Sequence, residues 1–260
     1  MRRETETAIR AAKIAQEIAV SRAGADQITS KGGIDLVTAA DVVCEDKIRE
    51  ELLRVFPDYS VIGEERGGEP FAGQPYWLVD PICGTRHFAS NIPLYCHNIA
   101  LVENGAVSVA AVGVGNTDEI LFAEKGAGGW IRTANGERRL SVSDRSNAIW
   151  IDGGPLVADV LRQAILLKRW YVWMYSTTLS LAHLADGRIA GILHLGPPRI
   201  VRAGSVHFAA GCLVASEAGA VVMDLETGRP WDLLTRSYLL ASTPEVQEEL
   251  MKLLAKASPR

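Results

Sequence analysis

The sequence predicts an α+β chain, and three observations lead to that fold class. An apolar helical pattern opens the chain, strands and tight turns occupy His97 to Leu140, and short strands alternate with helices after about Ser141. A chain of 260 residues has room for one large or two modest domains. We expect an N-terminal half over residues 1–140 and a C-terminal half over residues 141–260.

Two helices are predicted in the N-terminal half by apolar residues at helical spacing. These residues are Ala11, Ile14, Ala15 and Ile18 in the first helix, and Cys44, Ile48, Leu52 and Val55 in the second. The first helix is expected to end near Gly24. The second is expected to begin at the cap formed by Thr38 and Asp41 and to stop at Pro57. Residues 28–33, between the helices, are expected to form a flexible loop that carries Lys31.

The strands are predicted from apolar runs bounded by turn residues. They cover residues 59–62, 77–79, 98–103 and 106–114, and the Asn104-Gly105 pair is expected to close a hairpin between the last two. Farther along, helices are predicted over residues 180–184 and 207–219. The chain therefore passes from helices through a meander to mixed elements.

Composition and charge exclude several classes of protein. Hydrophobic residues make up 48% and charged residues 22%, which is typical of a globular chain that can bury its own core. Lys and Arg number 27 against 31 Asp and Glu, so the net charge of −4 argues against nucleic acid as a partner. Charged residues interrupt the N-terminal apolar positions, and no apolar run approaches the roughly 20 residues that span a bilayer, so we expect neither a signal peptide nor a membrane segment.

The cysteines indicate a reducing environment. The four cysteines lie far apart and form no CxxC pair, a spacing that matches neither a zinc ribbon nor a small secreted disulfide scaffold. A cytoplasmic location is therefore expected.

Acidic residues follow two of the predicted strands. Glu64 and Glu65 come after the first strand, and Asp80 ends the second, just before a tight turn that runs to Thr85. Carboxylates at strand ends are suitable ligands for hard cations, and the amides of Gly84 and Thr85 can face an anion. One acidic residue at a strand end is usually only solvated, but two such ends together indicate a site for metal and phosphate.

These segments resemble the signature motifs of the inositol monophosphatase family of magnesium-dependent phosphatases. Residues 61–65 read VIGEE, and residues 77–88 read WLVDPICGTRHF where the family usually has W-x-V-D-P-I-D-G-T-x-N-F. Residues 34–41, 98–105, 125–130 and 209–219 extend the likeness over nearly the whole chain. The resemblance implies a layered αβαβα sandwich of the inositol monophosphatase/fructose-bisphosphatase type, with the active site between the two halves, and a homodimer.

The resemblance also implies roles for matching residues. Glu64, Asp80 and the carbonyl of Ile82 would hold the first Mg²⁺. Glu64 with Thr85 would orient and deprotonate the attacking water, and the amides of Gly84 and Thr85 would hold the phosphate.

Three further residues have weaker parallels in the family. Asp41 and Glu65 would act farther out, near a third metal or behind the first ligands, although a helix cap alone also explains Asp41. Lys31 stands where the family has a mobile loop lysine near the metals.

Two departures from the family pattern fall on one metal. Cys83 replaces the second aspartate of the DPIDGT motif, and His207 replaces the aspartate of a later Trp-Asp pair. By resemblance, both lost aspartates bind the second magnesium, which they share with Asp80. Asp80, Cys83 and His207 are a plausible set for zinc or another softer metal, but we expect loss or weakening of the second site.

The residues that would select the substrate also differ from the family pattern. His194 replaces the acidic group that usually contacts the substrate hydroxyls, and Ser176 and Thr177 are expected near it. His97 and His183 lie in apolar surroundings and are expected to be packed, hydrogen-bonded residues.

The sequence thus predicts an inositol-monophosphatase-like protein that acts on a small phosphorylated metabolite, a sugar or polyol, with weak ordinary phosphatase activity. Two alternatives stay open. The chain could be a diverted enzyme that uses Cys83, His194 and His207 as acid–base groups on a phosphorylated metabolite. It could also be a homologue that binds a phosphorylated ligand without turnover.

Overall fold

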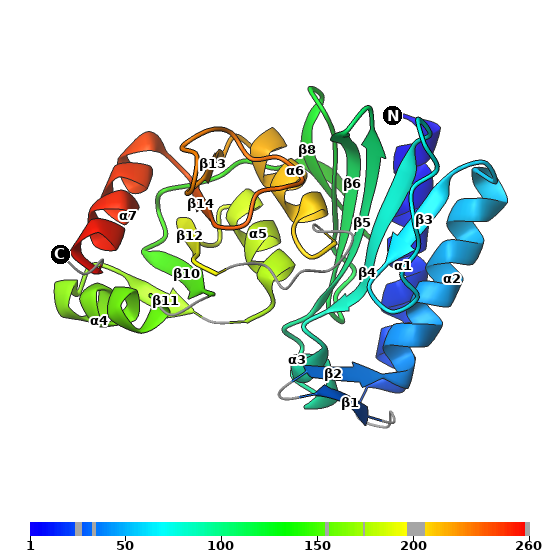
Figure 1. Ribbon diagram of the computed structural model, residues 1–260, viewed down its shortest axis with the longest axis horizontal. Helices are drawn as coiled ribbons and strands as arrows, with labels where there is room; N and C mark the ends of the chain where they lie inside the picture. Colours follow the sequence, from blue (N-terminus) through cyan, green and yellow to red (C-terminus); the bar gives the residue numbers. More distant parts are fainter. Residues whose placement is uncertain (24–27, 33–34, 154–155, 174, 197–205, 258–260) are drawn as a thin grey trace.

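The computed structural model describes residues 1–23, 28–32, 35–153, 156–173, 175–196 and 206–257 (Figure 1). In this part of the chain, two main sheets and six of the seven α-helices form alternating layers, while a short helix and a further pair of strands lie at one end of the larger sheet. Figure 1 shows the order across the molecule: helices, a sheet, helices, a second sheet and helices again. The layered αβαβα architecture expected from the sequence is therefore observed.

The larger sheet is a seven-stranded meander with one parallel pair. Its strands, in spatial order, are β3 (Ser60–Gly63), β4 (Tyr76–Cys83), β5 (Cys96–Glu103), β6 (Ala106–Val114), β7 (Ile120–Glu124), β8 (Gly128–Thr133) and β9 (Gly136–Arg139). β3 and β4 are parallel, and the other neighbours are antiparallel. Asn104 and Gly105 close the β5–β6 hairpin with positive φ angles, as the Asn-Gly pair predicts.

Helices α1 (Arg3–Arg22) and α2 (Ala39–Val55) cover the outer face of this sheet (Figure 1). Alanines at positions 8, 11, 12, 15 and 19 are fully buried, so their small side chains let α1 lie close to its neighbours. The expected cap of α2 is present as a reciprocal capping box between Thr38 and Asp41.

The smaller sheet has five strands. Their spatial order is β11 (Tyr171–Trp173), β10 (Ala148–Asp152), β12 (Gly191–His194), β14 (Tyr238–Ala241) and β13 (Val221–Asp224). Helices α4 (Val157–Leu167) and α7 (Pro244–Ala257) cover the outer face. The change from one sheet to the other falls between β9 and β10, close to residue 140, while a division into two domains stays a prediction.

The middle layer joins the two sheets through helices α5 (Thr177–Ala185) and α6 (Ala209–Glu217). Both helices are buried nearly all round, as expected for helices between two sheets. Gly211 allows them to approach, since a Cβ at this position would lie 2.6 Å from Cβ of Leu181. This close contact brings the start of α5 next to the segment that precedes α6.

Three local predictions differ from the structure. Residues 28–32 form strand β1 (Ile28–Gly32), which pairs with β2 (Asp35–Thr38). The hydrogen bonds from β2 stabilise this strand, although its sequence shows no apolar alternation typical of a strand. β4 continues past Asp80 to Cys83, through a bulge that accommodates Pro81. Helix α6 begins at Ala209, so His207 lies in the turn before it.

Among the described helices, none has the length and apolar character needed to cross a membrane.

Candidate functional site

The ends of β3 and β4 bring two carboxylates to one edge of the larger sheet. The two strands are parallel neighbours, so the chain leaves both at the same edge. The backbone N–H of Glu64 donates to the carbonyl of Val79 at 3.0 Å, which carries the pairing one residue beyond β3. Glu64 and Asp80 therefore both approach His207, which stands in the turn before α6.

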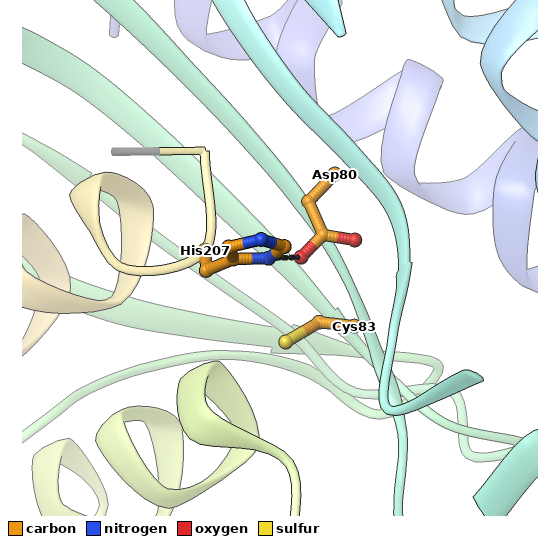
Figure 2. Close-up of side chains that lie close together, drawn as sticks. All are labelled: Asp80, Cys83 and His207. Carbon is orange, nitrogen blue, oxygen red and sulfur yellow. Dashed lines mark hydrogen bonds and ion pairs between the residues drawn. The ribbon is translucent and has the colours of Figure 1, made fainter. Parts of the chain in front are cut away.

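A bulge in β4 decides which side chains face this space. The pairing of β4 with β5 shifts register between Asp80 and Cys83. In a regular strand, residues three apart point to opposite faces of the sheet. The shift lets Asp80 and Cys83 face the same space, where one donor atom from each lies within 4.8 Å of a ring nitrogen of His207 (Figure 2).

Asp80 and His207 are joined by a hydrogen bond. Nδ1 of His207 lies 2.8 Å from Oδ2 of Asp80 and 3.9 Å from Oε2 of Glu64. Asp80 is fully buried, whereas the side chain of His207 is 38% exposed. Burial opposes the charged ring, but its hydrogen bonds to Asp80 and Cys83 outweigh that effect and raise the pKa of His207 well above its usual value.

Two buried residues that the sequence analysis did not identify hold this pair in place. Nδ2 of Asn98, on β5, donates to Oδ2 of Asp80 at 3.3 Å and to Oγ1 of Thr178 at 2.8 Å. The hydroxyl of Thr178, on α5, donates in turn to the backbone carbonyl of His207. No clear signal for them is present in the sequence, since both elements contain other polar residues.

Cys83 lies in a small cluster of sulfur and hydroxyl groups. It is directly opposite Cys96 in the β4–β5 pairing, and the hydroxyl of Ser176 donates to its sulfur at 3.2 Å. Hydrogen bonds from Cys96 and His207 lower the pKa of the Cys83 thiol. Burial, together with the neighbouring Cys83, raises the pKa of Cys96. Cys83 is therefore the cysteine of this pair that favours the thiolate.

Asp41 serves the cap of α2 and faces the site with its other oxygen. Its Oδ2 accepts from the backbone N–H and the hydroxyl of Thr38 at 2.8 and 2.6 Å, while Oδ1 lies 3.2 Å from the hydroxyl of Thr85. The Thr85 hydroxyl is also 3.1 Å from the carbonyl of Ile82. Burial, with the nearby charge of Glu64, raises the pKa of Asp41 to about 6. A role for Asp41 toward a metal stays a prediction.

Gly84 fixes the turn that presents Thr85. Its φ of 103° lies in the left-handed region that favours glycine, and it precedes the short helix α3 (Thr85–Ala89). A Cβ at Gly84 would lie 2.9 Å from the carbonyl oxygen of Leu94 and 3.0 Å from Cβ of Ser176. Only glycine fits this turn without movement of its neighbours.

Glu45, on α2, was not singled out by the sequence analysis, because an acidic residue on a helix is usually a solvated surface group. It is fully buried, and its carboxylate accepts from the backbone N–H groups of Glu65 at 2.7 Å and Arg66 at 3.1 Å. Arg49 donates to the same carboxylate at 2.9 Å. A Cβ at Gly63 would lie 2.0 Å from Oε1 of Glu45. The buried carboxylate thus shapes the turn that carries the two glutamates after β3.

His194 stands at the end of β12 between two aromatic rings. Its ring stacks on Trp150 and Tyr238, with centroids 6.2 and 4.8 Å away. Burial lowers the pKa of His194, so the neutral ring is favoured. Contact between His194 and a substrate stays a prediction.

The remaining predicted site residues lie on two elements. Ser176 caps α5 and is 5% exposed, and Thr177 is the first residue of that helix. Lys31 is on β1, and its side chain lies outside the described residues.

His97 and His183 are packed and hydrogen-bonded, as the sequence predicted. Nδ1 of His97 lies 2.5 Å from the carbonyl of Pro81, and Nδ1 of His183 lies 2.8 Å from the hydroxyl of Tyr175. These partners occupy one nitrogen of each ring, and neither histidine belongs to the cluster around Asp80.

The residues that the family resemblance assigns to two metals differ in their donor atoms. Glu64, Asp80 and the carbonyl of Ile82 offer oxygen atoms, which magnesium prefers. Oδ1 of Asp80 is buried and has no hydrogen-bond partner among the described residues. A buried carboxylate oxygen usually has a partner, and a bound cation would supply one. Cys83 and His207 instead offer sulfur and nitrogen, which suit magnesium poorly.

The chain belongs to the inositol monophosphatase family, because the family model matches residues 1–259. This membership agrees with the resemblance found in the signature motifs.

Among its relatives, an inositol-1-monophosphatase from Mesorhizobium japonicum is 30% identical over 246 residues, which cover 88% of this chain and 86% of the relative. Nus factor SuhB from Vibrio cholerae is 31% identical over 249 residues, covering 91% and 90%.

Solved structures support the fold. The extragenic suppressor protein suhB from Bartonella henselae superposes with a TM-score of 0.83 at 25% identity over 99% of both chains. An IMPase from Thermotoga maritima gives a TM-score of 0.82 at 25% identity, covering 97% of this chain and 96% of that one.

The buried position of Glu45 leads to a stability prediction. Glu45→Gln is expected to lower the free energy of unfolding by about 2–4 kcal/mol, because the amide keeps only one accepting oxygen and loses the charge opposite Arg49. Its NH₂ group would face a backbone N–H that now donates to the carboxylate. Urea unfolding followed by circular dichroism measures the change. The matched control is Glu50→Gln on the same helix, whose carboxylate is 67% exposed and pairs with Lys47. A change within about 0.5 kcal/mol is expected there. Similar losses in both variants would contradict the role given to Glu45.

The raised pKa of Asp41 predicts a pH dependence of stability in the metal-free protein. Its pKa is about 6 in the folded state against 3.8 ordinarily, so the folded state holds an extra proton between these values. The stability linked to that proton is complete below about pH 4 and lost as pH rises through about 6, by at most about 3 kcal/mol. Asp41→Asn should flatten this slope in urea unfolding with a chelator present. An unchanged slope in the variant would show that other groups cause it.

Proposed function

We propose that this chain acts on a phosphorylated sugar or polyol as a cytoplasmic, homodimeric phosphomonoester hydrolase, with weak activity when magnesium is the only metal. The observation that carries the proposal is the contrast within one site. By resemblance to the family, Glu64, Asp80 and Ile82 keep the oxygen donors of the first metal position, whereas Cys83 and His207 replace two aspartates of the second. In the structure, Asp80, Cys83 and His207 lie close together. Relatives named inositol-1-monophosphatase support the reaction class.

At the first position, Glu64, Asp80 and the carbonyl of Ile82 would hold Mg²⁺. When bound, magnesium supplies charge stabilisation to the phosphate and a more acidic water. The Thr85 hydroxyl, between Asp41 and Ile82, would orient the attacking water, and the carboxylate of Glu64 would accept its proton. The backbone N–H groups of Gly84 and Thr85 would bind the phosphate oxygens.

At the second position, the leaving oxygen would lose its usual stabilisation. Cys83 and His207 stand where the family has two aspartates, and the buried Asp80 keeps its hydrogen bond to His207. Losing one such electrostatic contact typically costs on the order of 10²–10³ in rate. The proposed outcome is a hydrolase in which the water is still activated but the leaving group is poorly stabilised.

Turnover of myo-inositol monophosphate with magnesium is expected to be at least ~10²-fold below that of a family member that retains both aspartates. Released phosphate is measured for the two proteins side by side. The remaining turnover should disappear in Glu64→Gln. Rates within a few-fold of the comparison enzyme would overturn the proposal, and calorimetric binding of the phosphomonoester without any turnover would favour the non-catalytic alternative.

Restoring both aspartates is expected to restore magnesium-dependent turnover. Cys83→Asp combined with His207→Asp should raise phosphate release by at least ~10²-fold, while each change alone should do much less, because both side chains serve one ion. The rates of the four proteins form a double-mutant cycle. Equal and additive gains from the single variants would argue against a shared metal.

A further inference from the structure

Asp80, Cys83 and His207 bring three different donors to one point. The carboxylate and the sulfur come from the bulged end of β4, and the ring comes from the turn before α6. One donor atom of each residue lies within 4.8 Å of the other two (Figure 2). The sequence alone favoured loss of this metal position, whereas the structure brings the three possible donors together.

Each of the three residues is held by a separate polar partner. Asn98 donates to Asp80, the hydroxyl of Ser176 donates to Cys83, and the hydroxyl of Thr178 donates to the carbonyl of His207. Such partners orient metal ligands in proteins and fix which atom points at the metal. Asn98 and Ser176 thus hold the Asp80 and Cys83 side chains, and Thr178 holds the backbone from which the His207 ring projects toward Asp80.

One oxygen of Asp80 lacks a partner. Asp80 is fully buried, and Oδ1 has no hydrogen-bond partner in the described part of the chain. A buried polar atom without a partner is unusual in a folded protein. A divalent cation at this point would satisfy the carboxylate, and its binding would release protons from the thiol and the ring.

The spacing of the donors suits zinc after a small movement. Zinc bonds of about 2.0 Å to oxygen and nitrogen and 2.3 Å to sulfur set tetrahedral donor atoms roughly 3.3–3.6 Å apart. Nδ1 of His207 and Oδ2 of Asp80 are 2.8 Å apart, so this contact would open by about half an ångström as the metal enters.

We propose that Asp80, Cys83 and His207 form a binding site for zinc or a similar borderline transition metal. A thiolate, an imidazole and a carboxylate are ligands that zinc accepts and magnesium discriminates against. Three protein ligands leave a fourth position for water or a substrate oxygen, which is the arrangement of zinc sites that take part in reactions. The inference goes beyond the proposed function and does not depend on turnover.

Zinc binding by the reduced, full-length chain tests the proposal. The protein is freed of metal with a chelator, given zinc chloride, and passed through a desalting column before elemental analysis. About one zinc per chain is expected for the wild type, with loss of most of it in Cys83→Ser. Cys44→Ser is the matched control, since Cys44 is also a buried cysteine but lies on α2, away from the three donors, and it should keep the zinc.

Reactivity of Cys83 gives a second readout. Bound zinc should shield the thiolate, so iodoacetamide, followed by peptide mass spectrometry, should label Cys83 slowly with zinc and at least ~10-fold faster after chelator. Zinc should also raise the thermal unfolding midpoint of the wild type and Cys44→Ser, but not that of folded Cys83→Ser.

The proposal is overturned by wild-type protein that retains no zinc, by equal zinc in wild type and Cys83→Ser, or by labelling of Cys83 that chelator does not change. Zinc binding without hydrolysis would support this site while leaving the proposed function without support. Hydrolysis without zinc binding would do the reverse.

Discussion

The burial of Asp80 is the constraint on which the site depends. A carboxylate without solvent must find its hydrogen bonds and its counter-charge within the protein. One oxygen of Asp80 accepts from Asn98 and contacts Nδ1 of His207, and the other has no partner among the described residues. The neighbouring residues thus supply hydrogen bonds to one oxygen only. A change at Cys83 or His207 therefore alters the surroundings of this buried carboxylate.

The sequence predicted the elements that follow a clear period. Apolar positions at helical spacing located α1 and α2, and the Asn-Gly turn located the β5–β6 hairpin, because these patterns reflect the local burial of each element. The pairing of β1 with β2 was missed, because the two segments lack the apolar alternation by which a strand is recognised in sequence. The extension of β4 through Pro81 was also missed, because proline usually ends a strand. Here the register shift between Asp80 and Cys83 makes a bulge, where proline does not interrupt regular pairing.

Within the site, residues with recognisable motifs were predicted more readily than residues that hold them. Glu64, Asp80 and Thr85 stand in segments that resemble the signature motifs of the family. Glu45 and Asn98 have no such context, because their importance comes from burial that only the packed fold creates. A glutamate on a helix is usually solvated. Here it lies against Gly63, and the missing side chain of the glycine makes room for its carboxylate.

The position of the cluster between layers has a mechanical consequence. Asp80 and Cys83 belong to the larger sheet, whereas His207 precedes a helix of the middle layer, and Thr178 joins that layer to the carbonyl of His207 (Figure 1). An ion held by these three side chains would add a cross-link between the larger sheet and the middle layer, beside the hydrogen bonds of Asn98 to Thr178 and of Ser176 to Cys83. The resistance of this seam to separation of the two layers would then depend on the metal content of the protein.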